Sequence, residues 1–157
     1  MKLEGTYEFQ APRDIVWDCL QDPEVIGSII PGAAVPEEIG ENHYQMVMEI
    51  NVGPVSGRFE SSIQLSNLVA PESYHMIVSG SGPPGHVKGD GDIRLEEQES
   101  STLMHYSGTA QVGGRVASVG QRLLDMTAKA ITAQSLKALA KRIERRAAEE
   151  TKQEGGR

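Results

Sequence analysis

The residue types that most often carry acid–base or metal chemistry are scattered along this sequence. None of its four histidines lies four residues from another, the spacing of a helix-borne metal pair: His43, His75, His86 and His105. Asp90 and Asp92 flank Gly91 and resemble a carboxylate pair, but the alternation around them places both on the solvent side of a strand. We therefore expect a solvated charged face there, and neither a metal site nor a catalytic pair.

Two glycine-rich segments offer backbone N–H groups to an anion. The segment 80–85 is followed by an expected strand instead of a helix N-terminus, so it predicts a turn. Gly113–Gly114 does precede a helix, and either a tight corner or an anion-binding corner fits it. Cys19 lies on the apolar face of an expected helix, which predicts a buried and unreactive thiol.

Methionine and glycine recur on one side of five alternating segments between Tyr44 and Val112. Methionine adapts to irregular apolar spaces, and glycine inside a strand leaves the covered face underfilled. Simple core filling is the alternative interpretation of the methionines. We predict an apolar ligand cavity, which favours binding over catalysis because no acids, bases or metal ligands converge on it. Its predicted lining is Tyr44, Met46, Met48, Phe59, Ser61, Met76, Gly89, Gly91, Met104, Tyr106, Leu123 and Met126.

The elements that would position this lining follow from the hydrophobic periodicity. Alternation with a period of two predicts strands in a sheet that is wet on one face only. Before these strands we expect a strand over about 2–10 and two short helices, opened by Pro12 and by Asp22–Pro23. A further strand near 34–39, a hairpin turn at 40–42 and a turn at Gly53–Pro54 complete the sheet.

From residue 115 the apolar spacing changes to three and four, which predicts one amphipathic helix of about 30 residues. Its small side chains would leave space against the sheet. The predicted inward face is Val116, Val119, Leu123, Met126, Ala130, Ala133, Leu136, Ala140 and Ile143.

Length and charge restrict the function further. The 157 residues suit one domain, expected over 1–146, and a charged tail over 147–157 that frays. The net charge of −7 argues against binding of nucleic acid. No apolar run suits a signal peptide or a membrane span, and one cysteine permits no internal disulfide. We therefore expect a cytoplasmic protein.

The order of one strand, two short helices, six strands and a long helix is similar to the helix-grip fold of the START-like (SRPBCC) superfamily. Short motifs extend the resemblance to the CoxG-like family of carbon monoxide dehydrogenase proteins over about residues 1–145. They are APRDIVW at 11–17, LQDPEV at 20–25, IPG at 30–32, VGPV at 52–55, GDG at 89–91, VGGR at 112–115 and VG at 119–120. The resemblance implies an α+β fold in which a curved antiparallel sheet of about seven strands grips a long C-terminal helix.

The same resemblance implies a non-enzymatic accessory protein of a molybdenum hydroxylase such as aerobic carbon monoxide dehydrogenase. Its partners would be the hydroxylase subunits and a lipophilic small molecule, such as a quinone or a lipid, held without a metal or covalent cofactor. The family is linked to enzyme recruitment at the membrane. Because this sequence ends in a charged tail where longer members carry an extension, we expect at most peripheral contact with the inner face of the membrane.

Two alternatives remain open at this point. An assembly or recruitment module would act through its surface, for example through Arg13, Trp17 or the basic residues Lys137, Lys141, Arg142, Arg145 and Arg146. A cyclase- or hydrolase-like enzyme, a class that the superfamily includes, would need a polar side chain aimed inward. The candidates for that role are Tyr44, Ser61, Tyr74 and Tyr106.

Overall fold

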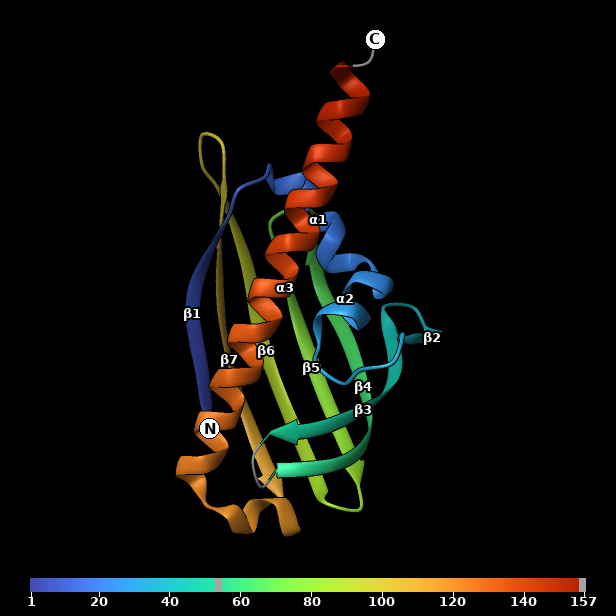
Figure 1. Cartoon of the computed structure of the whole chain (residues 1–157), viewed down its shortest axis with the longest axis vertical. Helices are drawn as coiled ribbons and strands as arrows, with labels where there is room; N and C mark the ends of the chain where they lie inside the picture. The colour runs from blue at the N-terminus through green and yellow to red at the C-terminus, as the bar shows by residue number, and fades with distance from the viewer. Residues whose placement is uncertain (53–54, 156–157) are drawn as a thin grey trace.

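The computed structural model, which describes residues 1–52 and 55–155, is built on one antiparallel sheet of seven strands crossed by a long helix (Figure 1). The strand order is β1-β7-β6-β5-β4-β3-β2. In chain order the elements are β1 (Lys2–Phe9), α1 (Arg13–Gln21), α2 (Pro23–Ile29), β2 (Glu37–Gly40), β3 (His43–Val52), β4 (Val55–Val69), β5 (Ser73–Gly82), β6 (Gly85–Glu97), β7 (Thr102–Gly113), the 3-10 helix η1 (Arg115–Val119) and α3 (Gln121–Gly155). This arrangement confirms the helix-grip architecture. The expected turn at Gly53–Pro54 and the chain end at 156–157 lie outside the described residues.

The alternation of side chains assigns one face of the sheet to the interior, as predicted. In β5, Tyr74 is only 5% exposed, whereas the next residue, His75, faces carboxylates on the outer side. Across the strands, inward positions lie opposite one another, so that Met76 pairs with Gly91 and Gly91 with Gly108. Helix α3 runs diagonally over this inner face, with α1 and α2 beside its C-terminal half (Figure 1).

The two short helices begin close to where their sequence signals predict. Asp22 is the N-cap of α2, because its carboxylate accepts a hydrogen bond of 3.0 Å from the Glu24 N–H, and Pro23 is the first helical residue. Pro12 is the N-cap of α1 and not its first residue, a shift of one position. The apolar faces of both helices bury Val16, Cys19 and Val25 in the main core.

The long helix does not begin at residue 115 as predicted. Residues Arg115–Val119 form η1, and Gly120 then adopts a φ of +98° before α3 starts at Gln121. A positive φ lies outside the helical region, so the helical phase counted from Val116 and Val119 does not continue into α3. The prediction for the first half of the helix was wrong for this reason.

The inward face of α3 is rotated accordingly. Leu124 and Thr127 are buried, whereas Met126 is 60% exposed and Ala130 and Ala133 face solvent. In the second half the prediction holds, because Ile143 is fully buried. The helix also continues to Gly155, so the segment expected to fray from residue 147 is helical as far as that residue.

Buried apolar residues gather at the two ends of α3 and not along its whole length. The main core joins α1, α2 and the sheet to Leu139 and Ile143. A second, smaller cluster joins Val116 of η1 to Leu124. The middle of α3 therefore spans a part of the sheet that neither cluster fills.

An ion pair connects α3 to the junction of α1 and α2. Arg146 Nη2 lies 2.9 Å from Asp22 Oδ2, and both side chains are about 30% exposed. Burial acts to raise the pKa of the Asp22 carboxyl, but hydrogen bonds from Arg146 and from the Glu24 N–H lower it below its ordinary value. The pair therefore holds α3 against the two short helices most firmly when Asp22 is ionised.

Replacing Arg146 with Met should lower the free energy of unfolding by about 1 kcal/mol at neutral pH. Since the folded-state pKa of Asp22 is depressed, its stabilising contribution is present above the ordinary pKa of 3.8 and is lost as the pH falls through the lower folded value. Urea unfolding of the wild type and the variant should thus differ at neutral pH and converge below about pH 3. Arg145→Met, at the exposed neighbour, is the control. An equal difference at both pH values would contradict this account.

Candidate functional site

An enclosed apolar chamber of about 190 Å³ lies between the sheet, the two short helices and α3, and we call it the inner chamber. Ile26 and Ile29 of α2 and Ile30 after it form one wall, and Leu139 of α3 forms another. The sheet contributes inward side chains from β3 to β7. The chamber exists because α2 stands on the edge of the sheet and holds α3 away from β3 and β4.

A second apolar space, the outer chamber, measures about 360 Å³ and lies under the middle of α3. Ile131 and Leu136 cover it from the helix, and Val78 and Val87 line it from strands β5 and β6. It is the more open of the two spaces. It occupies the region between the two apolar clusters, where no large side chain reaches from sheet to helix.

Glycines form the floor of the outer chamber because strands β6 and β7 approach too closely for side chains. A Cβ on Gly91 would lie 2.7 Å from the Ser107 carbonyl oxygen, and one on Gly108 would lie 2.7 Å from the Asp90 carbonyl oxygen. Side chains at these positions would have to push the two backbones apart. The glycines thus create the space beneath α3 and are also required by the curvature of the sheet.

The two chambers share a wall. Met76, Ile93, Met104 and Leu136 line both of them. Two of these residues are methionines, whose unbranched side chains change rotamer at low cost. The spaces are therefore adjoining compartments of one apolar region, divided only by side chains.

The inner chamber contains a few polar atoms in its otherwise apolar wall. Gln21, Tyr44 and Tyr74 line it. The Gln21 Nε2 atom is buried and has no hydrogen-bond partner among the described residues, an arrangement that costs about 1–3 kcal/mol unless another group accepts its hydrogen. Burial raises the pKa of Tyr74, whose ring meets Trp17 edge-on, and burial with the charges of Glu38 and Asp22 raises that of Tyr44. Both hydroxyls are therefore neutral donors at physiological pH.

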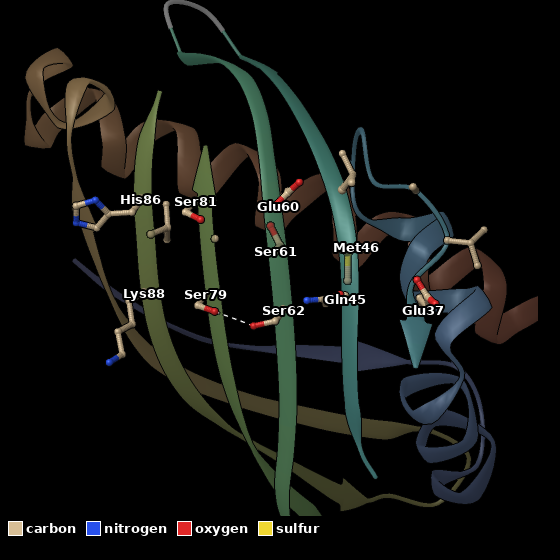
Figure 2. A pocket seen from close by; sticks show the side chains of 15 residues that line it. Glu37, Gln45, Met46, Glu60, Ser61, Ser62, Ser79, Ser81, His86 and Lys88 are labelled. Atoms are coloured by element: carbon tan, nitrogen blue, oxygen red, sulfur yellow. Dashed lines mark hydrogen bonds between the residues drawn. The ribbon is translucent and has the colours of Figure 1, made fainter. Parts of the chain in front are cut away.

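A larger groove of about 650 Å³ crosses the opposite, outer face of β3–β6 (Figure 2). Figure 2 shows α3 behind the sheet, with Ser62, Ser79 and Lys88 projecting from the outer face. Ser62 Oγ and Ser79 Oγ lie 2.7 Å apart. The groove is open and hydroxyl-rich, so an apolar molecule would gain little from entering it. We therefore place the candidate site in the two apolar chambers.

The structure brings together seven of the twelve residues predicted to line the cavity. Tyr44 and Met46 lie in the inner chamber, Met76 and Met104 in both, and the outer chamber holds Gly89, Gly91 and Tyr106. The other five are placed elsewhere. Ser61, with Met46, borders the outer-face groove, Met48, Phe59 and Leu123 line neither chamber, and Met126 faces solvent.

Sequence reasoning missed the contribution of α2 and of the β5–β6 pair. Ile26, Ile29 and Ile30 were interpreted as a helix face, although their position between a proline start and a proline stop was a signal that they cover an edge of the sheet. Ile93 and Tyr74 satisfy the same alternation as the predicted residues. The Gln21 amide gave no signal, because its burial depends on helices that meet only in the folded chain.

Titratable groups with specific partners lie outside the chambers. His75 Nδ1 is 2.9 Å from Asp92 Oδ1 and its Nε2 is 3.4 Å from Asp90 Oδ2, all on the outer face as predicted. Among the described residues, no group of three or more histidine, cysteine or acidic side chains is arranged to hold a metal ion. Within the same residues, no helix is both long and apolar enough to cross a membrane. Cys19 is buried, and this burial raises the pKa of its thiol.

Solved structures with the same fold span nearly the whole chain. A conserved protein from Geobacillus kaustophilus is 32% identical, with a TM-score of 0.89 over 92% of this chain and 96% of that one. A START superfamily protein from Mycobacterium smegmatis has a TM-score of 0.67 at 15% identity, over 92% and 97% of the two chains. The Zhui aromatase/cyclase from Streptomyces sp. R1128 has a TM-score of 0.65 at 18% identity, over 93% and 94%. The last two likenesses concern the fold alone.

A comparison with curated protein sequences gives no match. The family model for carbon monoxide dehydrogenase CoxG proteins matches residues 5–144, which include every strand pairing and the part of α3 that covers both chambers. This match agrees with the resemblance carried by the sequence motifs. The chain belongs to the CoxG family of carbon monoxide dehydrogenase proteins.

Proposed function

We propose that this protein binds a lipophilic molecule in the two chambers beneath α3 and serves as an accessory protein of a molybdenum hydroxylase of the carbon monoxide dehydrogenase type. The observation that carries the proposal is the pair of adjoining apolar chambers. Enclosed apolar space favours binding of an apolar ligand. Among the side chains that border it, the candidates for acid–base work are tyrosines with raised pKa values and Asp90 and Asp92, which face His75.

The family name supplies the partner, and the partner's chemistry suggests the ligand. A water-soluble dehydrogenase that feeds electrons to a membrane quinone pool needs its acceptor outside the bilayer. A protein that encloses the apolar part of a quinone or another lipid could carry it there. The proposal needs neither a metal nor a covalently attached cofactor, and it places the protein in the cytoplasm with at most peripheral contact to the membrane.

The alternative of an assembly module rests on the surface and not on the chambers. Of the basic residues considered for such a surface, Arg146 is paired with Asp22 and Arg142 Nη1 lies 3.4 Å from Ser28 Oγ. Lys137, Lys141 and Arg145 remain exposed on α3. A variant that fills the chambers and one that changes these residues therefore distinguish the two functions.

Extraction of the purified protein with organic solvent should release a lipophilic molecule that mass spectrometry can identify. After its removal, decylubiquinone at about 100 times its Kd should raise the Tm by about 5 °C or more, since ligand that binds only the folded state adds stability. Ile93→Trp, which fills the wall common to both chambers, should abolish the shift. Ile77→Trp, on the outer face of the same sheet, should retain it. An empty extract together with an unchanged Tm would contradict ligand binding.

The accessory role predicts faster quinone reduction by the molybdenum hydroxylase of the same organism when this protein is added. Ile93→Trp should remove that stimulation, because the chambers can no longer hold quinone. The Lys137→Glu/Lys141→Glu double variant should retain most of it. The assembly alternative predicts the reverse pattern, with stimulation lost in the surface variant and kept in the chamber variant. Quinone-reduction rates with each purified variant decide between them.

A further inference from the structure

The orphaned amide of Gln21 and the shared wall of the chambers together describe the ligand. We propose that the inner and outer chambers form a single site for one elongated, uncharged molecule. A hydrogen-bond acceptor such as a carbonyl lies at the Gln21 end, and an apolar tail extends under the middle of α3. This inference rests on the proposed function and adds to it the polarity, the orientation and the length of the ligand.

The size of the chambers favours one ligand across both. Sites for small molecules usually enclose about 300–1,000 Å³. The inner chamber, at about 190 Å³, is smaller than that range, and the outer chamber, at about 360 Å³, lies at its lower end. Met76, Met104 and Leu136 stand between them. Rotation of these flexible side chains would join the spaces without any movement of the backbone.

The polar atoms of the inner chamber fix which end of the ligand it takes. Gln21 Nε2 is buried without a partner, whereas Arg13 Nε and His105 Nε2, the other such atoms among the described residues, belong to residues that line neither chamber. The hydroxyls of Tyr44 and Tyr74 are also donors there. A ligand atom that accepts hydrogen bonds from this end would satisfy the amide, and an alkyl group would leave it unsatisfied.

The charges around the inner chamber favour a neutral acceptor over a carboxylate. Arg146 is already paired with Asp22, and the residues that line this chamber include no cation. Glu38 and Asp22 contribute negative charge near Tyr44. An anion placed here would lose its hydration without gaining a counterion, which is unfavourable.

The outer chamber offers an apolar tail a suitable surface. Its sheet side consists of valine and alanine side chains and the bare backbone of Gly89 and Gly91. The Tyr106 hydroxyl lies over Gly5, 2.6 Å from where a Cβ on that glycine would be, so it is directed toward β1. Thr132 and Ser135 lie on α3, where a hydroxyl can bond the carbonyl of the preceding turn.

The acceptor is tested with three probes of equal chain length: methyl nonyl ketone, undecane and undecanoate. Dissociation constants are measured on delipidated wild type and on Gln21→Leu, with Gln134→Leu on the exposed side of α3 as control. In Gln21→Leu, ketone binding should weaken about fivefold, the worth of one neutral hydrogen bond, while undecane binding stays equal or tightens. Undecanoate should bind the wild type more weakly than the ketone at neutral pH.

The span across both chambers is tested by blocking the outer one. Ser135→Trp should weaken methyl nonyl ketone at least about fivefold and leave the short methyl propyl ketone unchanged, because only the longer chain needs the outer chamber. Gln134→Trp, one position away and exposed, should change neither.

The outcomes separate this inference from the proposed function. Equal effects of Gln21→Leu on ketone and alkane, or an unchanged affinity for the long ketone in Ser135→Trp, would overturn the orientation and the span while leaving ligand binding intact. Tighter binding of undecanoate than of the ketone would overturn the neutral acceptor. Absence of binding for the apolar probes and for decylubiquinone alike would overturn the proposed function as well.

Discussion

The whole arrangement depends on a straight helix held at its two ends over a sheet that curves away from it. Near its C-terminal half, α3 packs through Leu139 and Ile143 against α1, α2 and the sheet, and Arg146 pairs with Asp22. At its start, Leu124 packs on Val116 of η1. A helix cannot bend to follow the sheet without losing backbone hydrogen bonds, so the space beneath its middle stays open unless side chains fill it. Here the sheet offers glycine, and the chambers result.

The same constraint explains why the site suits binding. The close approach of β6 and β7 at Gly91 and Gly108 excludes side chains from the floor, acidic and basic ones included. The charged residues of these strands, Asp90 and Asp92, occupy the outer face beside His75. The interior keeps apolar walls with neutral donors. Such a space can hold an apolar molecule and orient one acceptor atom, and it has little means to move protons.

Much of the fold was predictable because it follows local rules. The alternation of the strands, the cap at Asp22 and the proline that follows it each depend on neighbouring residues, and each is found where it was expected. The helix phase was not predictable from spacing alone. Gly120 looked like one more small residue in a helical stripe, but its φ of +98° interrupts the helix and turns Met126 toward solvent. Only the backbone path around η1 determines that rotation.

For the site, the sequence by itself determined that the covered face of the sheet is apolar, rich in methionine and glycine, and without acid–base groups. These properties depend only on residue type and on the period of two, which local geometry enforces. The tertiary structure decided which of those residues meet. It brought α2 over the sheet edge, divided the space with Met76, Met104 and Leu136, and left the Gln21 amide buried without a partner. Contacts of that kind join segments far apart in the chain, and their geometry is fixed only when the helices pack.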